Sequence, residues 1–287
     1  MQYFKPQTAA EATDILAKGE GKARILAGGT DLLVQLKSGM IEPESIVDIK
    51  HLEGIRDITQ EDGGYRIGAA VPGIKLGQHA GVVALWPGVV EACELIGSTQ
   101  VQGRCTMVGN LCNGSPAADS VPAMVAANAV VRIVGPDGTR DCAVIDIPTG
   151  PGKTSLKPGE FVTSIFLPAR PPRASDAYLR FIPRTEMDIA VASAGVSLEL
   201  AEDGTISAAR VTLGAVGPKV MLVEDAANAI VGTKLEDAAI DALMAACRAA
   251  ASPIDDKRGT VEFRTHVAGV LAKRAARIAM QRAGDKT

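Results

Sequence analysis

A short apolar stretch that runs into two adjacent glycines is the feature that most constrains how this sequence can fold. Residues 24–27 are followed by Gly28, Gly29, Thr30 and Asp31, and then by another apolar run. The pattern predicts a buried strand, a sharp turn and a helix that Thr30 or Asp31 can cap. Such a turn exposes backbone N–H groups and suits an anion, above all a pyrophosphate, although the same pattern also forms plain tight connections.

Length and composition set the class of protein. The chain has 287 residues, enough for two domains, and 47% of them are hydrophobic while 22% are charged. The net charge of −3 offers no electrostatic argument for binding nucleic acid or an anionic membrane surface. Apolar runs are too short to span a membrane, and residues 1–6 contain no apolar signal region, so we expect a cytoplasmic protein.

The cysteines and histidines do not form a metal-binding pattern. Five cysteines are present, without close pairs, which argues against a disulfide framework and fits a reducing compartment. Neither C-x-x-C nor H-E-x-x-H occurs, so we expect no metal or iron–sulfur site on this chain.

Periodicity and turn residues predict alternating helices and strands. Thr8 and Glu11 form a capping box for the first helix. Helices are expected over 9–19, 32–37, 89–96, 119–127, 223–230, 235–250 and 261–280, and strands over 24–27, 45–49, 65–69, 128–134, 140–147, 161–167, 177–182, 190–200 and 206–216. The stiff segment 168–173 (Pro-Ala-Arg-Pro-Pro-Arg) is expected to separate two domains.

The stretch 97–122 has a different composition. It is rich in Gly, Asn, Ser and Thr and shows no clear period, so it predicts a long functional loop that holds an extended polar ligand. Gly152, Lys153 and Thr154 resemble the end of a P-loop, but Ile147 stands where the first glycine is required, which excludes a nucleoside triphosphatase of that class.

Several motifs together resemble one known family. The motifs are Ala27–Asp31, Thr106–Asn110, Leu111–Asp119 (Leu-Cys-Asn-Gly-Ser-Pro-Ala-Ala-Asp), Gly150–Thr154, Pro158–Glu160 and Arg184–Ala190. They resemble those of the medium, FAD-binding subunit of the molybdenum hydroxylases, a family that includes xanthine dehydrogenase and carbon monoxide dehydrogenase. The resemblance covers nearly the whole chain.

The resemblance implies an α+β fold. A PCMH-type FAD-binding domain of two α/β subdomains would occupy residues 1–170, and a C-terminal domain with a three-stranded sheet plus helices would occupy residues 174–287. FAD would lie between the two subdomains, with the C-terminal domain closing over the flavin.

The resemblance also implies a set of cofactor-binding residues. The pyrophosphate and ribityl chain would lie along Ile25, Leu26, Ala27, Gly28, Gly29, Thr30, Asp31 and Leu32. Thr106, Gly109 and Asn110 would complete the cradle, Asp119 would accept hydrogen bonds from ribityl hydroxyls, and Asp188 with Ile189 would bring C-terminal backbone to the isoalloxazine. Tyr178 would either shield a flavin face or belong to the core. No residue of this chain is expected to act as a catalytic acid or base.

One position departs from the family pattern. Val108 stands where the family carries the first glycine of Gly-Gly-Asn. A β-branched residue is strained at positive φ, so either Gly109 alone adopts the special conformation or FAD binding is weakened.

The implied function is electron transfer within a heteromeric enzyme. A large partner subunit would hold the molybdenum cofactor and a small one the 2Fe-2S clusters, the whole forming a dimer of heterotrimers. FAD on this chain would pass electrons to NAD, oxygen, a quinone or another carrier. Two alternatives stay open: a self-sufficient FAD-dependent oxidoreductase of the same fold, and a nucleotide-binding regulatory protein that has lost the flavin.

Overall fold

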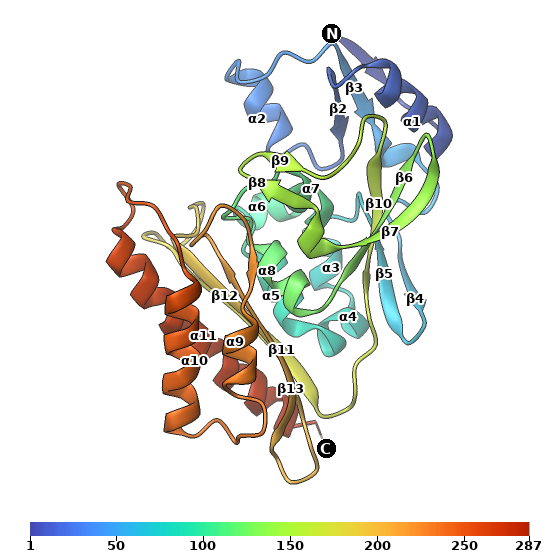
Figure 1. Cartoon of the computed structure of the whole chain (residues 1–287). Helices are drawn as coiled ribbons and strands as arrows, with labels where there is room; N and C mark the ends of the chain where they lie inside the picture. The colour runs from blue at the N-terminus through green and yellow to red at the C-terminus, as the bar shows by residue number, and fades with distance from the viewer. Residues whose placement is uncertain (287) are drawn as a thin grey trace.

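The structure is a computed structural model that describes residues 1–286. Three parts follow one another from the N-terminus at the top of Figure 1 to the C-terminus at the bottom. They are a small α/β lobe, a central lobe built on an antiparallel sheet, and a C-terminal domain in which a sheet is covered by long helices.

The first lobe is a three-stranded parallel sheet with the order β1-β3-β2. Its elements are β1 (Gln2–Phe4), α1 (Ala9–Lys18), β2 (Ala23–Leu26), α2 (Leu32–Lys37) and β3 (Ser45–Asp48), followed by the 3-10 turn Ile49–His51. The predicted capping of α1 is present, since Thr8 Oγ1 accepts a hydrogen bond from the backbone N–H of Glu11. The Glu11 carboxylate accepts from Gln7 N–H, one residue before the expected donor.

The central lobe is a five-stranded antiparallel sheet with the order β4-β5-β10-β6-β7. The strands are β4 (Ile58–Glu61), β5 (Gly64–Gly68), β6 (Val130–Gly135), β7 (Gly138–Ala143) and β10 (Phe161–Leu167), and β8 (Pro148–Gly150) pairs with β9 (Lys153–Thr154). The helices are α3 (Gly73–Gly77), α4 (Ala80–Leu85), α5 (Pro87–Glu94), α6 (Thr99–Gln102), α7 (Met107–Cys112) and α8 (Ser120–Ala126), with the 3-10 turn Val144–Asp146. One continuous apolar core joins this lobe to the first.

The C-terminal domain is an antiparallel sheet between two layers of helices. Its elements are β11 (Ala174–Phe181), β12 (Ala192–Leu200), β13 (Ile206–Gly214), β14 (Met221–Leu222), α9 (Glu224–Asn228), α10 (Asp237–Ala250) and α11 (Val261–Gly284). Helix α11 packs on β11 and β12, with α10 alongside it, whereas α5 and α8 of the central lobe pack against the same strands from the other side (Figure 1). Because side chains alternate across a strand, Ala177 belongs to the C-terminal core while Tyr178 belongs to the core of the FAD-binding half.

The predicted mixed helix and sheet class is confirmed, and several elements differ from the prediction. The C-terminal sheet has a fourth, two-residue strand, β14, and the short strands β1 and β4 were not predicted. The expected strand 140–147 ends at Ala143, where the chain enters a 3-10 turn. The stretch 97–122 is not one irregular loop, because it contains α6, α7 and the start of α8. Within residues 1–286, no helix has the length and apolarity needed to cross a membrane.

Candidate functional site

A cavity of about 530 Å³ lies where the first lobe meets the central lobe. Its walls come from the turn after β2, from α2, from α7 and from the segment that follows β9. Most of the predicted cofactor-binding residues line it: Ile25, Ala27, Gly28, Gly29, Thr30, Asp31, Leu32, Thr106, Gly109 and Asn110. The structure therefore brings the two glycine-bearing turns, which are far apart in the sequence, into one site.

The two turns meet backbone against backbone at Gly28. A Cβ atom at this position would lie 2.0 Å from the carbonyl oxygen of Arg104 and 2.8 Å from its carbonyl carbon. No side chain fits there, so the approach requires glycine. Gly29 is needed for a different reason, because its φ of +74° lies in the left-handed region that favours glycine.

The first turn leaves a run of backbone donors in the cavity wall. As α2 begins, the N–H of Leu33 donates to the carbonyl of Gly29, and the N–H of Gln35 donates to the carbonyl of Asp31. For the N–H groups of residues 28–32, no acceptor is found within residues 1–286. These amides are free to bind an anionic ligand.

Asp31 does not cap α2 as predicted. It occupies the N-cap position, but its side chain accepts no capping hydrogen bond, and Thr30 makes none either. Asp31 is partly exposed to solvent. The cavity walls nevertheless remove part of the hydration of its carboxyl group, and this desolvation raises its pKa.

The second turn is held rigidly by side-chain hydrogen bonds. Thr106 begins α7, and its Oγ1 accepts from the N–H of Gly109 at 2.9 Å. Asn110 Oδ1 accepts from the N–H and the hydroxyl of Ser120, which ties α7 to the start of α8. Gln35 Nε2 donates to Asn113 Oδ1 at 3.2 Å and joins α2 to α7. The opposite walls of the cavity are thereby cross-linked.

The condition for strain at Val108 is not met, and Gly109 does not adopt the special conformation that was offered as one of the two alternatives. Val108 lies in the first turn of α7 and is buried, and neither it nor Gly109 has a positive φ. A β-branched residue is compatible with helical backbone, so no special conformation is required at either position. Val108 lines the cavity as an apolar wall.

Apart from Asp31, the charged side chains of the cavity were not predicted as site residues. Arg24 and Lys157 line it, and within residues 1–286 neither forms an ion pair. Glu160 also lines the cavity, but its carboxylate forms a bidentate ion pair with Arg140, which lowers the pKa of Glu160 to about 2. Its negative charge is therefore already paired. The two unpaired cations favour an anionic ligand. The motifs Gly150–Thr154 and Pro158–Glu160, to which no role was given, were the sequence features that pointed to the segment after β9.

Asp119 lies outside the cavity, in a buried cluster. Tyr178 Oη donates to Asp119 Oδ1 at 3.0 Å, and Arg180 Nη1 donates to Oδ2 at 2.6 Å. Burial raises the pKa of Asp119 to about 6, although Arg180 and Tyr178 oppose the shift. Tyr178 is 2% exposed and does not line the cavity. Of the two roles that the sequence left open for it, shielding the flavin or packing in the core, this placement favours the core.

Asp188 and Ile189 are also placed away from the cavity. They lie in the loop between β11 and β12, where Asp188 pairs with Arg184 at 3.1 Å and with Arg258 at 3.8 Å. Ile189 is 51% exposed. Leu26 ends β2 beside the cavity without lining it. In the described part of the chain, no group of three or more His, Cys, Asp or Glu side chains is arranged to hold a metal ion.

Comparisons with known proteins agree with this architecture. The family profile described as "FAD binding domain in molybdopterin dehydrogenase" matches residues 1–170, and that of the "CO dehydrogenase flavoprotein C-terminal domain" matches residues 165–279. The carbon monoxide dehydrogenase medium chain of Afipia carboxidovorans is 33% identical to this chain, and the alignment covers 98% of this chain and 97% of the relative. The xanthine dehydrogenase FAD-binding subunit of Escherichia coli O157:H7 is 30% identical, with 99% of this chain and 97% of the relative aligned.

A solved structure shows the same fold. A chain of the reconstituted CO dehydrogenase from Oligotropha carboxidovorans superimposes with a TM-score of 0.94 at 32% identity, covering 98% of each chain. This match extends over both the FAD-binding half and the C-terminal domain. The protein therefore belongs to the family of FAD-binding flavoprotein subunits of the molybdopterin dehydrogenases, which are oxidoreductases, and the resemblance seen in its sequence is confirmed.

Proposed function

We propose that this chain is the FAD-carrying electron-transfer subunit of a heteromeric molybdenum hydroxylase. The observation that carries the proposal is the cavity in which two glycine-bearing turns meet, with the backbone of Gly28 against that of Arg104 and a run of unpartnered N–H groups in its wall.

The residues of the cavity fit FAD. The free N–H groups of residues 28–32 suit the pyrophosphate, and the unpaired cations Arg24 and Lys157 add to the attraction for a dianionic diphosphate. We propose that Thr106, Gly109 and Asn110 bind from the opposite wall. The proposal keeps Leu26, Asp119, Asp188 and Ile189 as contacts of the part of FAD that extends past this cavity.

FAD supplies the redox chemistry when bound, because it accepts and releases one or two electrons. The residues of this chain bind it, orient it and exclude water from it. Among the residues that line the cavity we assign no catalytic acid or base to the organic substrate. The reaction on that substrate would take place at the molybdenum centre of a large partner subunit.

The proposal extends to partners and location. The relatives are a medium chain and a FAD-binding subunit by name, which supports a multi-subunit assembly. We propose a large subunit with the molybdenum cofactor, a small subunit with 2Fe-2S clusters that feed the FAD, and a dimer of these heterotrimers in the cytoplasm. The external acceptor would be NAD, oxygen, a quinone or another carrier. We also propose that residues 1–170 and 174–287 are the two domains.

Purification from the native host tests this function. The expected complex contains this chain with a larger and a smaller chain, together with molybdenum, iron and one FAD for each copy of this chain. A chain that runs alone and oxidises a substrate at full rate would instead be a self-sufficient flavin enzyme. A native chain without flavin would favour the nucleotide-binding regulatory protein.

A further inference from the structure

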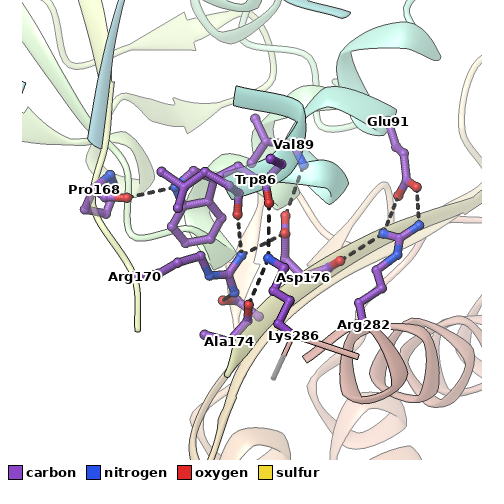
Figure 2. Close-up of polar contacts among 12 residues, drawn as sticks. Trp86, Val89, Glu91, Pro168, Arg170, Ala174, Asp176, Arg282 and Lys286 are labelled. Atoms are coloured by element: carbon purple, nitrogen blue, oxygen red, sulfur yellow. Dashed lines mark hydrogen bonds and ion pairs between the residues drawn. The ribbon is translucent and has the colours of Figure 1, made fainter. Parts of the chain in front are cut away.

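The segment that joins the two domains is fastened by a buried cation. Figure 2 shows Arg170 against the indole ring of Trp86, with its guanidinium carbon 4.0 Å from a ring centroid. Arg170 Nη1 donates to Asp176 Oδ1 at 2.9 Å and to the carbonyl of Leu85 at 3.1 Å. Trp86 Nε1 in turn donates to the carbonyl of Pro168. The segment that was expected to separate the two domains is therefore fixed to the corner between α4 and α5.

Asp176 joins this linker to the central lobe. Its second oxygen, Oδ2, accepts from the N–H of Val89 in the first turn of α5 at 3.1 Å (Figure 2). The side chains of Arg170 and Asp176 are only 4% and 3% exposed. A buried ion pair with both partners hydrogen-bonded is costly to disturb, because removing either charge leaves the other without compensation.

A second, more exposed set of bonds comes from the end of α11. Arg282 pairs with Glu91 on α5 and donates to the carbonyl of Asp176 at 3.0 Å. Lys286 Nζ donates to the carbonyls of Ala84 and Ala174. The junction thus has a buried inner part around Arg170 and an outer part around Arg282.

The strand that carries Asp176 also carries the partners of Asp119. Asp176, Tyr178 and Arg180 are alternate residues of β11, so their side chains project from one face of the strand. Asp176 bonds α5, whereas Tyr178 and Arg180 both bond Asp119 at the start of α8. One face of β11 therefore connects the junction to Asp119, which the proposed function places in contact with FAD.

We propose that the Arg170–Asp176 pair is a positioning device that fixes β11 on the FAD-binding half and thereby holds Tyr178 and Arg180 on Asp119. Neither Arg170 nor Asp176 lines the cavity, so their influence on the site passes through the strand. A strand whose polar face is bonded at several points cannot slide or tilt without breaking those bonds. The part of the proposal that concerns FAD rests on the function proposed above.

The test uses Asp176→Asn, which removes the charge and keeps the size and the acceptor for Val89. Asp141→Asn is the matched control, since Asp141 pairs with Arg132 on the exposed β6–β7 hairpin, away from the junction. Ser197→Ala is a milder second variant, because Ser197 accepts from Arg170 Nη2 and its loss leaves no buried charge unpaired. Ser197→Ala keeps the proposal testable if Asp176→Asn does not fold.

The first measurement is hydrogen exchange in the FAD-free full-length chain. In Asp176→Asn we expect amides in residues 110–121 to exchange at least about fivefold faster, with a smaller change of the same sign in Ser197→Ala. In Asp141→Asn the same amides should keep the wild-type rate. Acceleration confined to residues 84–91 and 168–176 would overturn the proposal, because the disturbance would then stop at the junction.

The second measurement is FAD binding with the visible circular dichroism of bound FAD. In Asp176→Asn we expect the dissociation constant for FAD to be about tenfold higher. We also expect the circular dichroism spectrum of the bound FAD to change at saturating FAD. A folding defect alone would leave the shape of that spectrum unchanged. Wild-type affinity and an identical spectrum would refute the coupling while leaving the proposed function intact. If the wild-type chain binds no FAD, the proposed function fails, and the exchange measurement alone decides this inference.

Discussion

Replacing Gly28 by alanine tests the backbone contact on which the cavity depends. The added Cβ would lie 2.0 Å from the carbonyl oxygen of Arg104, about 1 Å inside the 3.0 Å that real Cβ atoms keep. The obstacle is backbone and cannot rotate away, so the turn and the segment 103–105 must separate by about that distance. Gly28 does not have a positive φ, so the effect is steric and not conformational strain.

The size of the effect follows from the energy of overpacking. Forcing one additional carbon into a closed contact costs about 1–3 kcal/mol. We expect the free energy of unfolding to fall within that range, and the FAD affinity to fall by at least about tenfold, since about 1.4 kcal/mol corresponds to a factor of ten. The affinity loss arises because the free N–H groups of residues 28–32 move away from the opposite wall.

The assay is FAD titration of the flavin-free chain, together with urea unfolding. Gly103→Ala is the matched control, because its Cβ would have its nearest neighbour at 3.9 Å and its φ is not positive. The control should bind FAD as the wild type does and be equally or slightly more stable. If Gly28→Ala binds FAD with wild-type affinity, the assignment of this contact to the cofactor site is refuted.

Two further predictions concern Asp119 and Thr106. Because burial places the pKa of Asp119 at about 6, above its usual 3.8, its contribution to stability is intact below pH 4 and is lost as the pH rises through 6. The stability of the FAD-free wild type relative to Asp119→Asn should therefore fall by about 2 kcal/mol between pH 4 and pH 7 in urea unfolding, and a rise would mean that Arg180 dominates the titration. Thr106→Val removes the hydroxyl that caps α7 and should cost about 1 kcal/mol of unfolding free energy and weaken FAD binding, whereas unchanged values in both assays would show that the cap does not shape the site.

Long elements could be predicted from the sequence because their period is visible over many residues. The helices α10 and α11 and the strands β12 and β13 lie close to where periodicity placed them. The elements that were missed are short or polar. β1 has three residues, β4 carries the polar sequence Ile-Thr-Gln-Glu, and α6 and α7 have four and six residues, too few for a helical repeat to show.

The same distinction applies to the site. The turn at Gly28 and Gly29 is a local feature and could be predicted, whereas Thr106 was named through the family resemblance and its role as the N-cap of α7 was not predicted. The contact of Gly28 with Arg104 and the presence of Lys157 and Arg24 in the wall of one cavity depend on packing between distant segments, for which a single sequence carries no local signal. Whether Val108 would be strained could not be decided from the motif alone for a related reason, because the backbone conformation there is set by α7.

The placement of Asp119 depends on the C-terminal domain. Its motif was visible in the sequence, but its partners Tyr178 and Arg180 belong to a strand of the other domain. Only the folded chain shows that this carboxylate is buried and already hydrogen-bonded, and that its environment is linked through β11 to Asp176. Long-range packing therefore decides what a locally recognisable residue can do.

Calorimetric titration of the purified, flavin-free chain with FAD tests the central claim most directly. We predict one FAD bound for each chain, displaced by neither riboflavin nor inorganic phosphate, because both the diphosphate and the rest of the cofactor are held. The absence of saturable FAD binding, or equally tight binding of ADP alone, would contradict it.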